Sequence, residues 1–443
     1  MVRCNLTQVQ FTNRADQVQS DSGIINPACS VVNTLRGRDE IIGTQTVNGN
    51  FGFGVLAGLG GVNFHSAIAS AQFRSQVTIA TDGIKNEGII TTNGGRDLIK
   101  GTATANLSAT ATTISQAIAI AETANTSVIA QALTSIELKA TADGIDNTRG
   151  QIHTNEGGDT IEATTEGSLV AIARAIADVS AIVPGIAEAP VSENLTAFAG
   201  AIAQSLIQAE IATKGINNQE GIITTGTGND VITANVASNI ATFSQTAAFV
   251  LSLALPQNEA LAQAVAEVEA DAVAEASDEA IAIDNTRGMI HMAQGRDAIQ
   301  AIAEASNRAI AIDNSHGLIW MGSGRDHILA KAIGSDAYGI YGGDIVTGSG
   351  ADTVIASSFG GGVNINLGRG NDFIEGFGDA VLNGGKGFDT LSFGTYQKSN
   401  FQISLGTSQD DLLFELDGIA METSGFENYM FADGNYHHDL LLA

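Results

Sequence analysis

The stretch WMGSGRDHILA, residues 320–330, decides the fold of this chain because close relatives of it recur along most of the sequence. Its centre reads glycine, any residue, aspartate, any residue, aliphatic. This pattern occurs nine times, with aspartates at positions 39, 97, 159, 230, 297, 326, 352, 372 and 389. Nine copies of one short unit indicate a chain that grows by stacking coils rather than by adding globular domains.

A second repeated segment precedes several of these copies. It reads GIKNEGIITT from Gly83, GIDNTRGQIHT from Gly144 and GINNQEGIITT from Gly215, and related forms begin at Ala282 and Ala311. Short apolar runs separated by Asn/Gly and Gly/Asp pairs are typical of strands joined by tight turns. Each unit is therefore interpreted as strand, Asn/Gly turn, strand, Gly/Asp turn, strand. We predict an all-β core, a right-handed parallel β-solenoid of the β-roll or β-helix kind.

Four units are longer than the others, and their extra residues always enter at the same point. The repeat aspartates are 29 residues apart from Asp297 to Asp326 but 58 to 71 residues apart in the first four units. The insertions lie at about residues 45–80, 103–140, 165–211 and 235–276. Insertion at one point of each coil predicts a row of projections along one flank of the solenoid.

Composition favours helix in the insertions, although their periodicity leaves an alternative. The segment NEALAQAVAEVEADAVAEAS, residues 258–277, is rich in Ala and Glu, which are good helix formers. Prolines near the middle of two insertions, Pro184, Pro190 and Pro256, fit loops between antiparallel helices. The period-2 alternation of the same segment also fits a strand. We predict Ala-rich helical hairpin insertions, with further strands as the alternative; one helical face would carry Leu261, Val265, Val268 and Ala272.

Composition also limits the partners. The 443 residues carry a formal net charge of -28. Binding nucleic acid needs clustered Lys and Arg, so cations and basic surfaces suit this chain better. The first residues, MVRCNLTQVQFTNRADQ, lack the apolar core and cleavage site of a secretory signal. The longest apolar run, TAAFVLSLALP at 246–256, is too short to span a bilayer, so we expect no transmembrane segment.

The glycines and aspartate of the repeat admit a structural and a metal-binding interpretation. A tight turn needs glycine where φ is positive, and an aspartate can close such a turn by accepting backbone N–H groups. Calcium takes roughly six to eight oxygen ligands, which stacked turns can supply as backbone carbonyls and Asp carboxylates.

The C-terminal copies resemble the RTX, or hemolysin-type, nonapeptide GGxGxDxUx, where U is aliphatic. GGKGFDTLS (384–392) fits every defined position, and LGRGNDFIE (367–375), TGSGADTVI (347–355), MGSGRDHIL (321–329) and TGTGNDVIT (225–233) lack only the first glycine. In that family the repeats form a parallel β-roll with calcium ions between successive loops, so the resemblance implies bound Ca²⁺. The candidate metal-binding residues are Gly226, Gly228, Asp230, Gly322, Gly324, Asp326, Gly348, Gly350, Asp352, Gly368, Gly370, Asp372, Gly385, Gly387 and Asp389.

Earlier copies depart from this pattern, and several copies carry an arginine directly before the aspartate. The copies without the second glycine are those of Asp39, Asp97, Asp159 and Asp297. The arginines are Arg38, Arg96, Arg296 and Arg325. Such an arginine either points into solvent or places its guanidinium among stacked carboxylates and takes over the ion's role. The sequence leaves both possibilities open, together with calcium binding in the remaining copies.

The last fifty residues extend the resemblance. The segment that begins FDTLSFG and includes FENYMFADGNY looks like the C-terminal part of cyanobacterial and other RTX proteins exported by type I secretion. It would also serve as a cap that closes the open edge of the solenoid. The expected organisation is an N-terminal cap at 1–30, solenoid coils with the insertions at 31–346, RTX-like calcium-binding coils at 347–392, and a C-terminal β cap with the secretion segment at 393–443.

No catalytic constellation stands out, so we do not expect an enzyme. Carboxylates abound, but they recur with the coil and are interpreted as structural. His153, His291 and Trp320 occupy the same position of three units, which predicts an outward stacked ladder rather than a ligand set. No Ser/His/Asp arrangement, CxxC pair or phosphate-binding loop is evident.

These observations together lead us to expect a secreted calcium-binding structural protein, extracellular or at the cell surface. It would fold at extracellular calcium concentrations and self-assemble into a filament or sheet. Its expected partners are calcium, further copies of itself, and extracellular polysaccharide or a cell surface. Two rivals are a β-helix enzyme acting on extracellular polysaccharide and a calcium-dependent, membrane-active toxin that uses the insertions.

Overall fold

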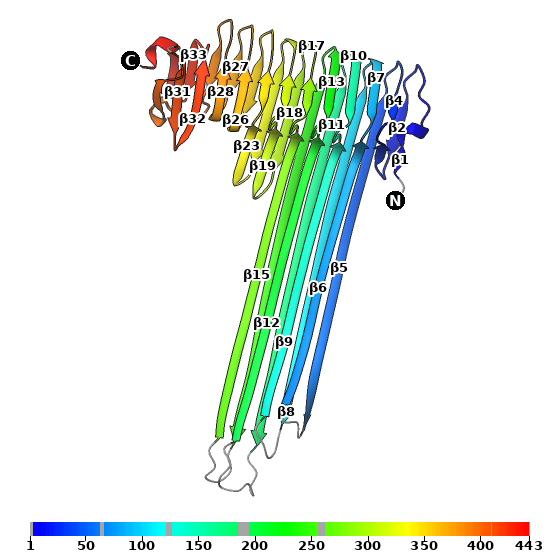
Figure 1. Cartoon of the computed structure of the whole chain (residues 1–443), viewed down its shortest axis with the longest axis vertical. Helices are drawn as coiled ribbons and strands as arrows, with labels where there is room; N and C mark the ends of the chain where they lie inside the picture. The colour runs from blue at the N-terminus through cyan, green and yellow to red at the C-terminus, as the bar shows by residue number, and fades with distance from the viewer. Residues whose placement is uncertain are drawn as a thin grey trace.

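The chain forms a parallel β-solenoid from which a long, flat projection extends (Figure 1). The computed structural model describes residues 3–62, 66–120, 126–184, 195–255, 262–408 and 410–442. Each coil contributes strands to three faces, and these strands pair in parallel with their counterparts in the neighbouring coils. The predicted parallel β-solenoid is confirmed.

The first face is a 12-stranded sheet that begins after each Gly/Asp turn. Its strands are β2 (Gln17–Ser20), β5 (Glu40–Val62), β8 (Leu98–Ile120), β11 (Thr160–Pro184), β14 (Val231–Leu255), β18 (Ala298–Glu304), β22 (His327–Ile333), β25 (Thr353–Ala356), β27 (Phe373–Glu375), β29 (Thr390–Ser392), β33 (Asn428–Phe431) and β34 (Gly434–His437).

The strand on the second face leads to the Asn/Gly turn, and the strand on the third face leads from there to the next Gly/Asp turn. The second face consists of β1 (Cys4–Asn5), β3 (Ile24–Asn26), β6 (Ser66–Asn86), β9 (Thr126–Asp146), β12 (Leu195–Asn217), β15 (Ala262–Asp284), β19 (Arg308–Asp313), β23 (Asp336–Tyr341) and the first residues of β26 (Phe359–Asn366) and β28 (Gly378–Asn383). The later residues of β26 and β28 pair along the third face, and β32 (Ile419–Ser424) follows them there. The third face consists of β4 (Val31–Asn33), β7 (Ile89–Gly95), β10 (Gln151–Gly157), β13 (Ile222–Thr227), β16 (Met289–His291), β17 (Gln294–Gly295), β20 (Leu318–Trp320), β21 (Ser323–Gly324) and β24 (Asp344–Val346).

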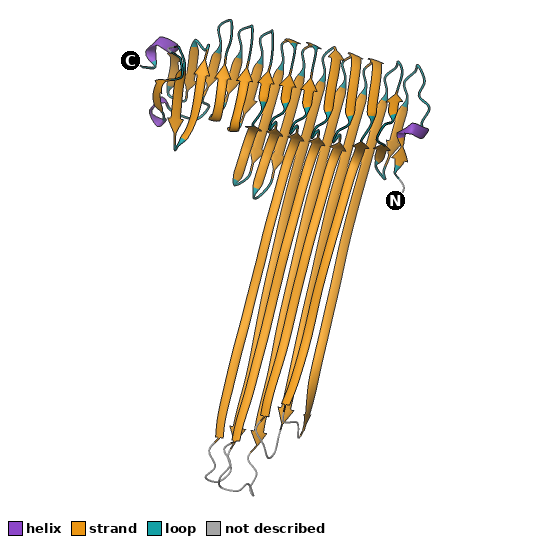
Figure 2. Cartoon of the chain, viewed as in Figure 1, coloured by secondary structure: helices purple, strands orange, loops and turns teal. Residues whose placement is uncertain are grey.

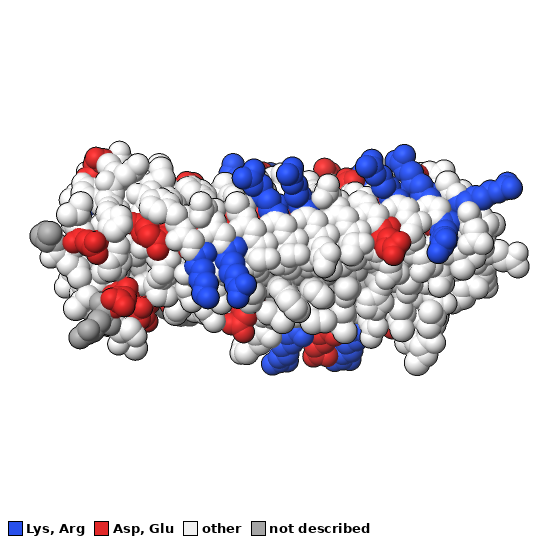
Figure 3. Space-filling view, turned by 90° about the horizontal axis from the view of Figure 1, so that it is seen from above, with Lys and Arg blue, Asp and Glu red and all other residues white. Residues whose placement is uncertain are grey.

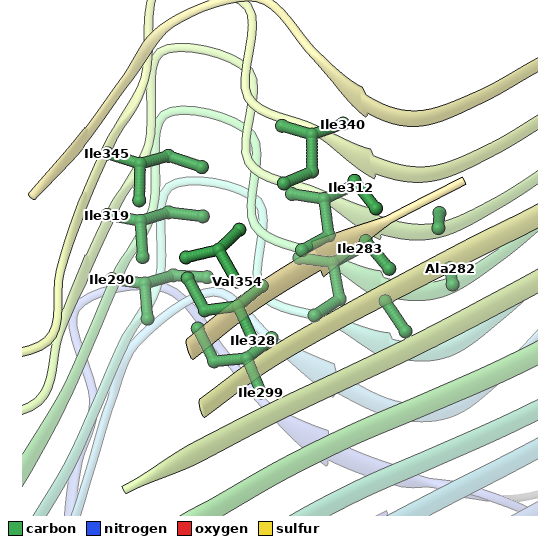
Figure 4. Close-up of a cluster of buried hydrophobic side chains, with 14 of the residues drawn as sticks. Ala282, Ile283, Ile290, Ile299, Ile312, Ile319, Ile328, Ile340, Ile345 and Val354 are labelled. Carbon is green, nitrogen blue, oxygen red and sulfur yellow. The ribbon is translucent and has the colours of Figure 1, made fainter. Parts of the chain in front are cut away.

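The solenoid core is built from columns of aliphatic side chains, one per face. Ile283, Ile312 and Ile340 stack on the second face, and all three are fully buried (Figure 4). Matching columns from the other faces meet them in the interior (Figure 4); they contain Ile290, Ile319, Ile345, Ile299, Ile328 and Val354. Because one aliphatic residue per strand recurs in register, each coil buries its apolar face against its neighbours.

A row of buried asparagines fixes the turn between the second and third faces. Asn86 Nδ2 donates to Asn147 Oδ1 over 2.6 Å, and Asn147 Nδ2 donates to Asn218 Oδ1 over 2.7 Å. The same bond links every consecutive pair in the row Asn26, Asn86, Asn147, Asn218, Asn285 and Asn314. An asparagine offers both a donor and an acceptor, so one side chain can bond the coil on either side.

The insertions are strands, and the predicted helical hairpins are wrong. Each insertion prolongs a first-face strand outward and a second-face strand back, giving eight strands of 21 to 25 residues (Figure 2). We call the resulting two-layered projection the blade. Strand β11 pairs with β8 and β14 over nearly its whole length. These in-register hydrogen bonds to neighbouring coils outweigh the helix propensity of alanine, because propensity yields to tertiary context.

The residues behind the helical prediction take other positions in the blade. Val268 and Ala272 lie within β15, and Pro184 is the last residue of β11. Leu261, Pro190 and Pro256 lie outside the described residues, and the side chain of Val265 is not described. The period-2 alternation that offered the strand alternative places alanine inside and polar residues outside in β8 and β11.

The two layers of the blade lie very close together. Its interior is lined mainly by alanine, including the fully buried Ala111, Ala132 and Ala173. Side-chain hydroxyls therefore reach the backbone of the opposite layer: Thr134 Oγ1 donates to the Arg174 carbonyl over 2.9 Å, and Ser115 Oγ donates to the Ala69 carbonyl over 2.8 Å. Sheets packed through larger side chains lie about 10 Å apart, too far for such bonds.

The C-terminal end departs from the parallel pattern. Strands β30 (Gln402–Leu405), β31 (Leu412–Leu416) and β32 pair antiparallel, as do β33 and β34. An aromatic cluster fills this end; it comprises Phe377, Phe393, Phe401, Phe414, Phe431 and Tyr429. Within the described ranges the helices are three short 3-10 turns, Leu6–Gln8, Lys398–Asn400 and His438–Leu440, and none offers an apolar span of membrane length.

Candidate functional site

The nine repeat aspartates form one buried row along the Gly/Asp turns. We call this the aspartate row. Asp326 Oδ1 accepts the backbone N–H of Asp297 over 2.9 Å, and Asp352 Oδ1 accepts that of Asp326 over 2.9 Å. The same bond links every consecutive pair from Asp39 to Asp389 at 2.7 to 2.9 Å. Glu427 Oε2 accepts the N–H of Asp389 over 2.6 Å and ends the row.

The row contains both the aspartates that the sequence predicts as calcium ligands and those for which it leaves calcium binding undecided. Asp230, Asp326, Asp352, Asp372 and Asp389 stand in line with Asp39, Asp97, Asp159 and Asp297, and all are buried. The aspartate therefore takes the same position in copies of the repeat with one glycine and in copies with two. The missing glycine in the earlier copies does not displace their carboxylates.

The glycines of the repeat are required by close contact between coils. At Gly350, where φ is +151°, a Cβ atom would collide with the carbonyl oxygen of Gly324 in the preceding coil. At Gly348, where φ is +106°, it would collide with the Gly322 carbonyl. The same clash excludes a side chain at Gly226, Gly228, Gly322, Gly324, Gly368, Gly370, Gly385 and Gly387. Steric fit alone thus accounts for glycine at these positions, whatever the turn binds.

The arginines that precede the aspartates point outward. Arg38, Arg96, Arg296 and Arg325 are all exposed, although the neighbouring aspartates are buried. Figure 3, which looks at the long side of the solenoid opposite the blade, shows basic side chains gathered along its upper border. The open question of Arg325 is therefore answered, because its guanidinium does not lie among the stacked carboxylates.

Each carboxylate of the aspartate row has one oxygen without a partner. All nine Oδ2 atoms are buried and accept no hydrogen bond from the described residues. Loss of solvation raises the pKa of Asp326 and of Asp372 to about 7, and that of Asp297 and of Asp389 to about 6. Burial opposes the charged form of a carboxyl, and neighbouring carboxylates in the row add to the effect.

The residue five positions before each aspartate of the row changes the environment of that aspartate's carboxyl group. Asp97, Asp159 and Asp230 are preceded at that distance by Thr92, Thr154 and Thr225. Burial raises the pKa of these aspartates too, but each threonine hydroxyl lies beside the carboxyl and lowers the pKa in part, although outside strict hydrogen-bond geometry. Asp297, Asp326, Asp372 and Asp389 have Met292, Met321, Leu367 and Gly384 at this position, and none of these offers a hydroxyl.

A second acidic group, which the sequence did not reveal, lies on the second face at the base of the blade. Carboxylate oxygens of Asp82, Asp143 and Asp146 lie within 4.8 Å of one another, and no other such group of three occurs in the part of the chain that the structure describes. Burial raises the pKa of Asp143 to about 7, while Asn217 Nδ2 donates to its Oδ2 over 3.0 Å. In the sequence Asp82 and Asp143 precede glycine in TDGIKN and ADGIDN, and only the stacking of coils brings them together.

Basic side chains accompany this group. Arg3 Nη2 lies 2.8 Å from Asp82 Oδ2, and Lys85 Nζ lies 3.8 Å from Asp146 Oδ2. Lys214 lowers the pKa of Asp143 by its charge, against the larger effect of burial. Lys214 lies closer to Asp284, at 2.6 Å, and Lys85 lies closer to Glu87, at 3.2 Å, so the three carboxylates belong to a wider ionic network.

The predicted outward aromatic ladder is present in part. The rings of His291 and Trp320 stack with centroids 4.6 Å apart and an interplanar angle of 14°. Thr224 separates them from His153 in the same column. Trp320 is 46% exposed and directly precedes the Gly/Asp turn that carries Arg325.

Comparison with protein families, with curated proteins and with solved structures gives no match for this chain. The fold itself defines its class as a parallel β-solenoid, and the aspartate row is its most regular polar feature.

Proposed function

We propose that this protein is a calcium-binding structural protein of the extracellular space or cell surface, in which the solenoid presents the blade for assembly with further copies. The single observation that carries the proposal is the aspartate row. Nine buried carboxylates, each with an unpartnered Oδ2, repel one another when ionised and favour any condition that neutralises them.

Calcium suits this row because it is a hard cation that prefers anionic and carbonyl oxygens. The Oδ2 atoms would supply one anionic oxygen per coil. The double-glycine turns that end at Asp230, Asp326, Asp352, Asp372 and Asp389 add backbone carbonyls beside it, as the RTX resemblance implies. A cation that binds the folded row and not the unfolded chain stabilises the fold by mass action. Folding would then follow export into a calcium-rich medium.

A non-enzymatic role is supported by the burial of the carboxylates. A catalytic carboxyl group has to lie within hydrogen-bond reach of its substrate. All nine aspartates of the row are buried and accept the same backbone hydrogen bond, so none of them faces a surface on which a substrate would lie. The membrane-active alternative drew on helical hairpins, and the insertions are strands instead.

The experiment is thermal unfolding followed by circular dichroism at pH 7.5, in EDTA and after addition of calcium or magnesium. Calcium should raise the midpoint, and magnesium should do so less because it demands a tighter octahedral shell. Asp372→Asn, which removes one buried charge, should reduce the response to calcium. Asp379→Asn, at an exposed position of β28, is the matched control. An unfolding midpoint indifferent to calcium would refute the proposal.

Binding of an anionic polysaccharide is a second candidate, favoured by Trp320. An exposed tryptophan stacked on His291 offers a flat surface for a sugar ring, and Arg296 and Arg325 follow in the adjoining turns. Retention of the protein on immobilised alginate, at several salt concentrations, tests this role. Trp320→Ala should abolish retention if the surface is used, and Trp320→Phe should restore part of it; equal retention of all three proteins would exclude it.

A further inference from the structure

The blade has two open edges where long strands lack a neighbour. On the N-terminal side, β2 covers only Glu40–Gly43 of β5, and β3 covers only Ile84–Asn86 of β6. On the C-terminal side, β18 covers Val231–Ala237 of β14 and β19 covers Glu279–Asp284 of β15. The remaining lengths expose unpaired N–H and C=O groups, which favour pairing with another strand.

The two edges differ in charge. At the C-terminal edge the free stretch of β14, residues 238–255, carries no charged residue, but that of β15 in the other layer carries the exposed carboxylates Glu267, Glu269, Asp271 and Glu275. The free stretches of the other edge, residues 46–62 and 66–83, contain one acidic residue, Asp82 at the base of the blade, which pairs with Arg3, and one cation, Arg74. Charged side chains on an edge strand oppose edge-to-edge pairing, and like charges placed opposite one another are destabilising. The N-terminal edge, which we call the neutral edge, has no row of carboxylates in either layer, so both of its layers are open to pairing with a second copy of the chain.

The pattern of β5 is symmetric about Leu56. Its outward positions are Gly52, Gly54, Leu56, Gly58 and Gly60, so antiparallel pairing centred on Leu56 places Gly54 opposite Gly58 and Gly52 opposite Gly60. A Cβ atom at Gly52, Gly54 or Gly58 would meet nothing within 4 Å. The strand is thus uncrowded on this face. Leu56 itself is 72% exposed and would meet its own counterpart across a two-fold axis.

The inward side of the same strand is equally suited to this register. Phe53 faces the blade interior, where its ring stacks on Phe73 with centroids 4.9 Å apart. It is nevertheless 39% exposed, and Leu59 on the same side is 46% exposed, because the edge is uncovered. Pairing centred on Leu56 brings Phe53 of each copy opposite Leu59 of the other. Both side chains would then be buried, and apolar cross-strand pairs of this kind stabilise a sheet.

One two-fold axis serves both layers. The Phe53–Phe73 stack and the bond from Thr81 Oγ1 to the Gln45 carbonyl fix the alignment of β5 and β6. This alignment places Leu56 over about Ser70, so an axis through both pairs β6 with its own copy around Ser70. Ile68 then lies opposite Gln72, and no carboxylate enters the contact.

The placement of the solenoid permits this arrangement and blocks the parallel one. The N-terminal strands β1 to β4 lie beside the base of the blade, so a second blade cannot continue the sheet in the same direction (Figure 1). The two-fold axis sends the second solenoid to the opposite end of the blade. The free length of β5 is then available from residue 50 to residue 62.

We infer that two copies of this chain pair antiparallel through the neutral edge, with Leu56 and Ser70 at the two-fold axis, to form a continuous two-layered blade with a solenoid at either end. This inference deepens the proposed structural role by naming the surface and the partner.

The test is the molar mass of the full chain by light scattering after size exclusion, with calcium and with EDTA. The wild type should be a dimer, and Leu56→Lys should weaken dimerisation by roughly tenfold or more, because two lysines then face each other in place of two leucines. Phe249→Lys, an exposed position on β14 at the other edge, is the matched control and should leave the dimer intact. A wild type that is monomeric, or a Leu56→Lys dimer as stable as the wild type, would overturn the inference.

Disulfide trapping checks the register independently of stability. In a Cys4→Ser, Cys29→Ser background, Leu56→Cys should cross-link to itself under mild oxidation. Gly54→Cys should cross-link only when mixed with Gly58→Cys. Self-linking of Gly54→Cys, or no linking of the mixture, would contradict the antiparallel register. Circular dichroism of each variant separates this result from the calcium proposal: a folded, calcium-responsive monomer refutes the pairing alone, and a calcium-indifferent dimer refutes the calcium role alone.

Discussion

At the scale of single residues, the aspartates of the row share one hydrogen-bond geometry in every coil, but the groups around their carboxyls differ. Every aspartate accepts the same backbone bond, yet Asp326 and Asp372 lack the nearby hydroxyl that Asp97 and Asp159 have. With pKa values of about 7, these two carboxyls are protonated in the folded chain below about pH 7. In an unfolded chain an aspartate titrates near a pKa of about 3.9. The difference couples folding to protons.

The sign of this coupling gives a pH prediction. A raised carboxyl pKa contributes stability that is fully present below about pH 4 and is lost as pH rises through 6 to 7. In EDTA, the free energy of unfolding measured with urea should therefore fall between pH 5 and pH 8. Asp326→Asn should flatten this fall and, at pH 8, stabilise the chain by on the order of 1–2 kcal/mol. A fall that is unchanged in the variant would show that Asp326 does not titrate in this range.

The asparagine row supplies a second prediction at this scale. Asn218 accepts from Asn147 and donates to Asn285, and all three are buried. Asn218→Ala leaves a donor of Asn147 and an acceptor of Asn285 without this partner, which should cost about 2–3 kcal/mol. Urea unfolding measures the loss. Asn239→Ala, at an exposed position of β14, should be within about 0.5 kcal/mol of the wild type, and an equal loss in both would contradict the role of the row.

At the scale of elements, the blade shows where sequence reasoning succeeds and where it fails. The repeat spacing predicts the solenoid and the place of each insertion, because the aspartates mark every coil. The form of the insertions depends instead on which strands become neighbours. Residues 160–184 are extended because 98–120 and 231–255 lie in register on either side. Composition describes a segment in isolation and so favoured helix. The acidic group at Asp143 has the same origin, since its members are joined only by stacking.

Because the two layers of the blade lie close together, a larger side chain in the interior should destabilise the chain. Ala173 on β11 is fully buried in the blade interior, where hydroxyls of one layer bond carbonyls of the other. Ala173→Leu should destabilise the chain by about 1–3 kcal/mol, because a larger side chain forces the layers apart. Glu166→Leu, on the exposed side of the same strand, changes no interior contact and should be nearly neutral. Thermal unfolding compares the two, and a neutral Ala173→Leu would show that the layers separate freely.

At the scale of the whole molecule, the solenoid and the blade are two parts of the same stack of coils. The same registers continue from the core into the projection, as in the pairing of β8 with β11 from Leu98 to Ile120. The width of the blade is therefore set by how many coils carry an insertion. Its length is set by the inserted strands, and the solenoid fixes both edges.

This relation predicts that a single insertion can be removed without loss of the solenoid. The coil of β18 and β19 turns through Ala305, Ser306 and Asn307, and the sequence ASD at 276–278 occupies the same place in the preceding coil. Deleting residues 238–275 joins Ala237 to Ala276 and makes that coil match its neighbour in length. The shortened chain should fold with the β-sheet spectrum of the wild type and with its calcium response, because the aspartate row is untouched. The remaining blade should expose β11 and β12 as its new edge, while the neutral edge and dimerisation stay as they were. An unfolded product would mean that the last insertion is needed to hold the coils together, which would overturn the view of the blade as an extension of an independently stable stack.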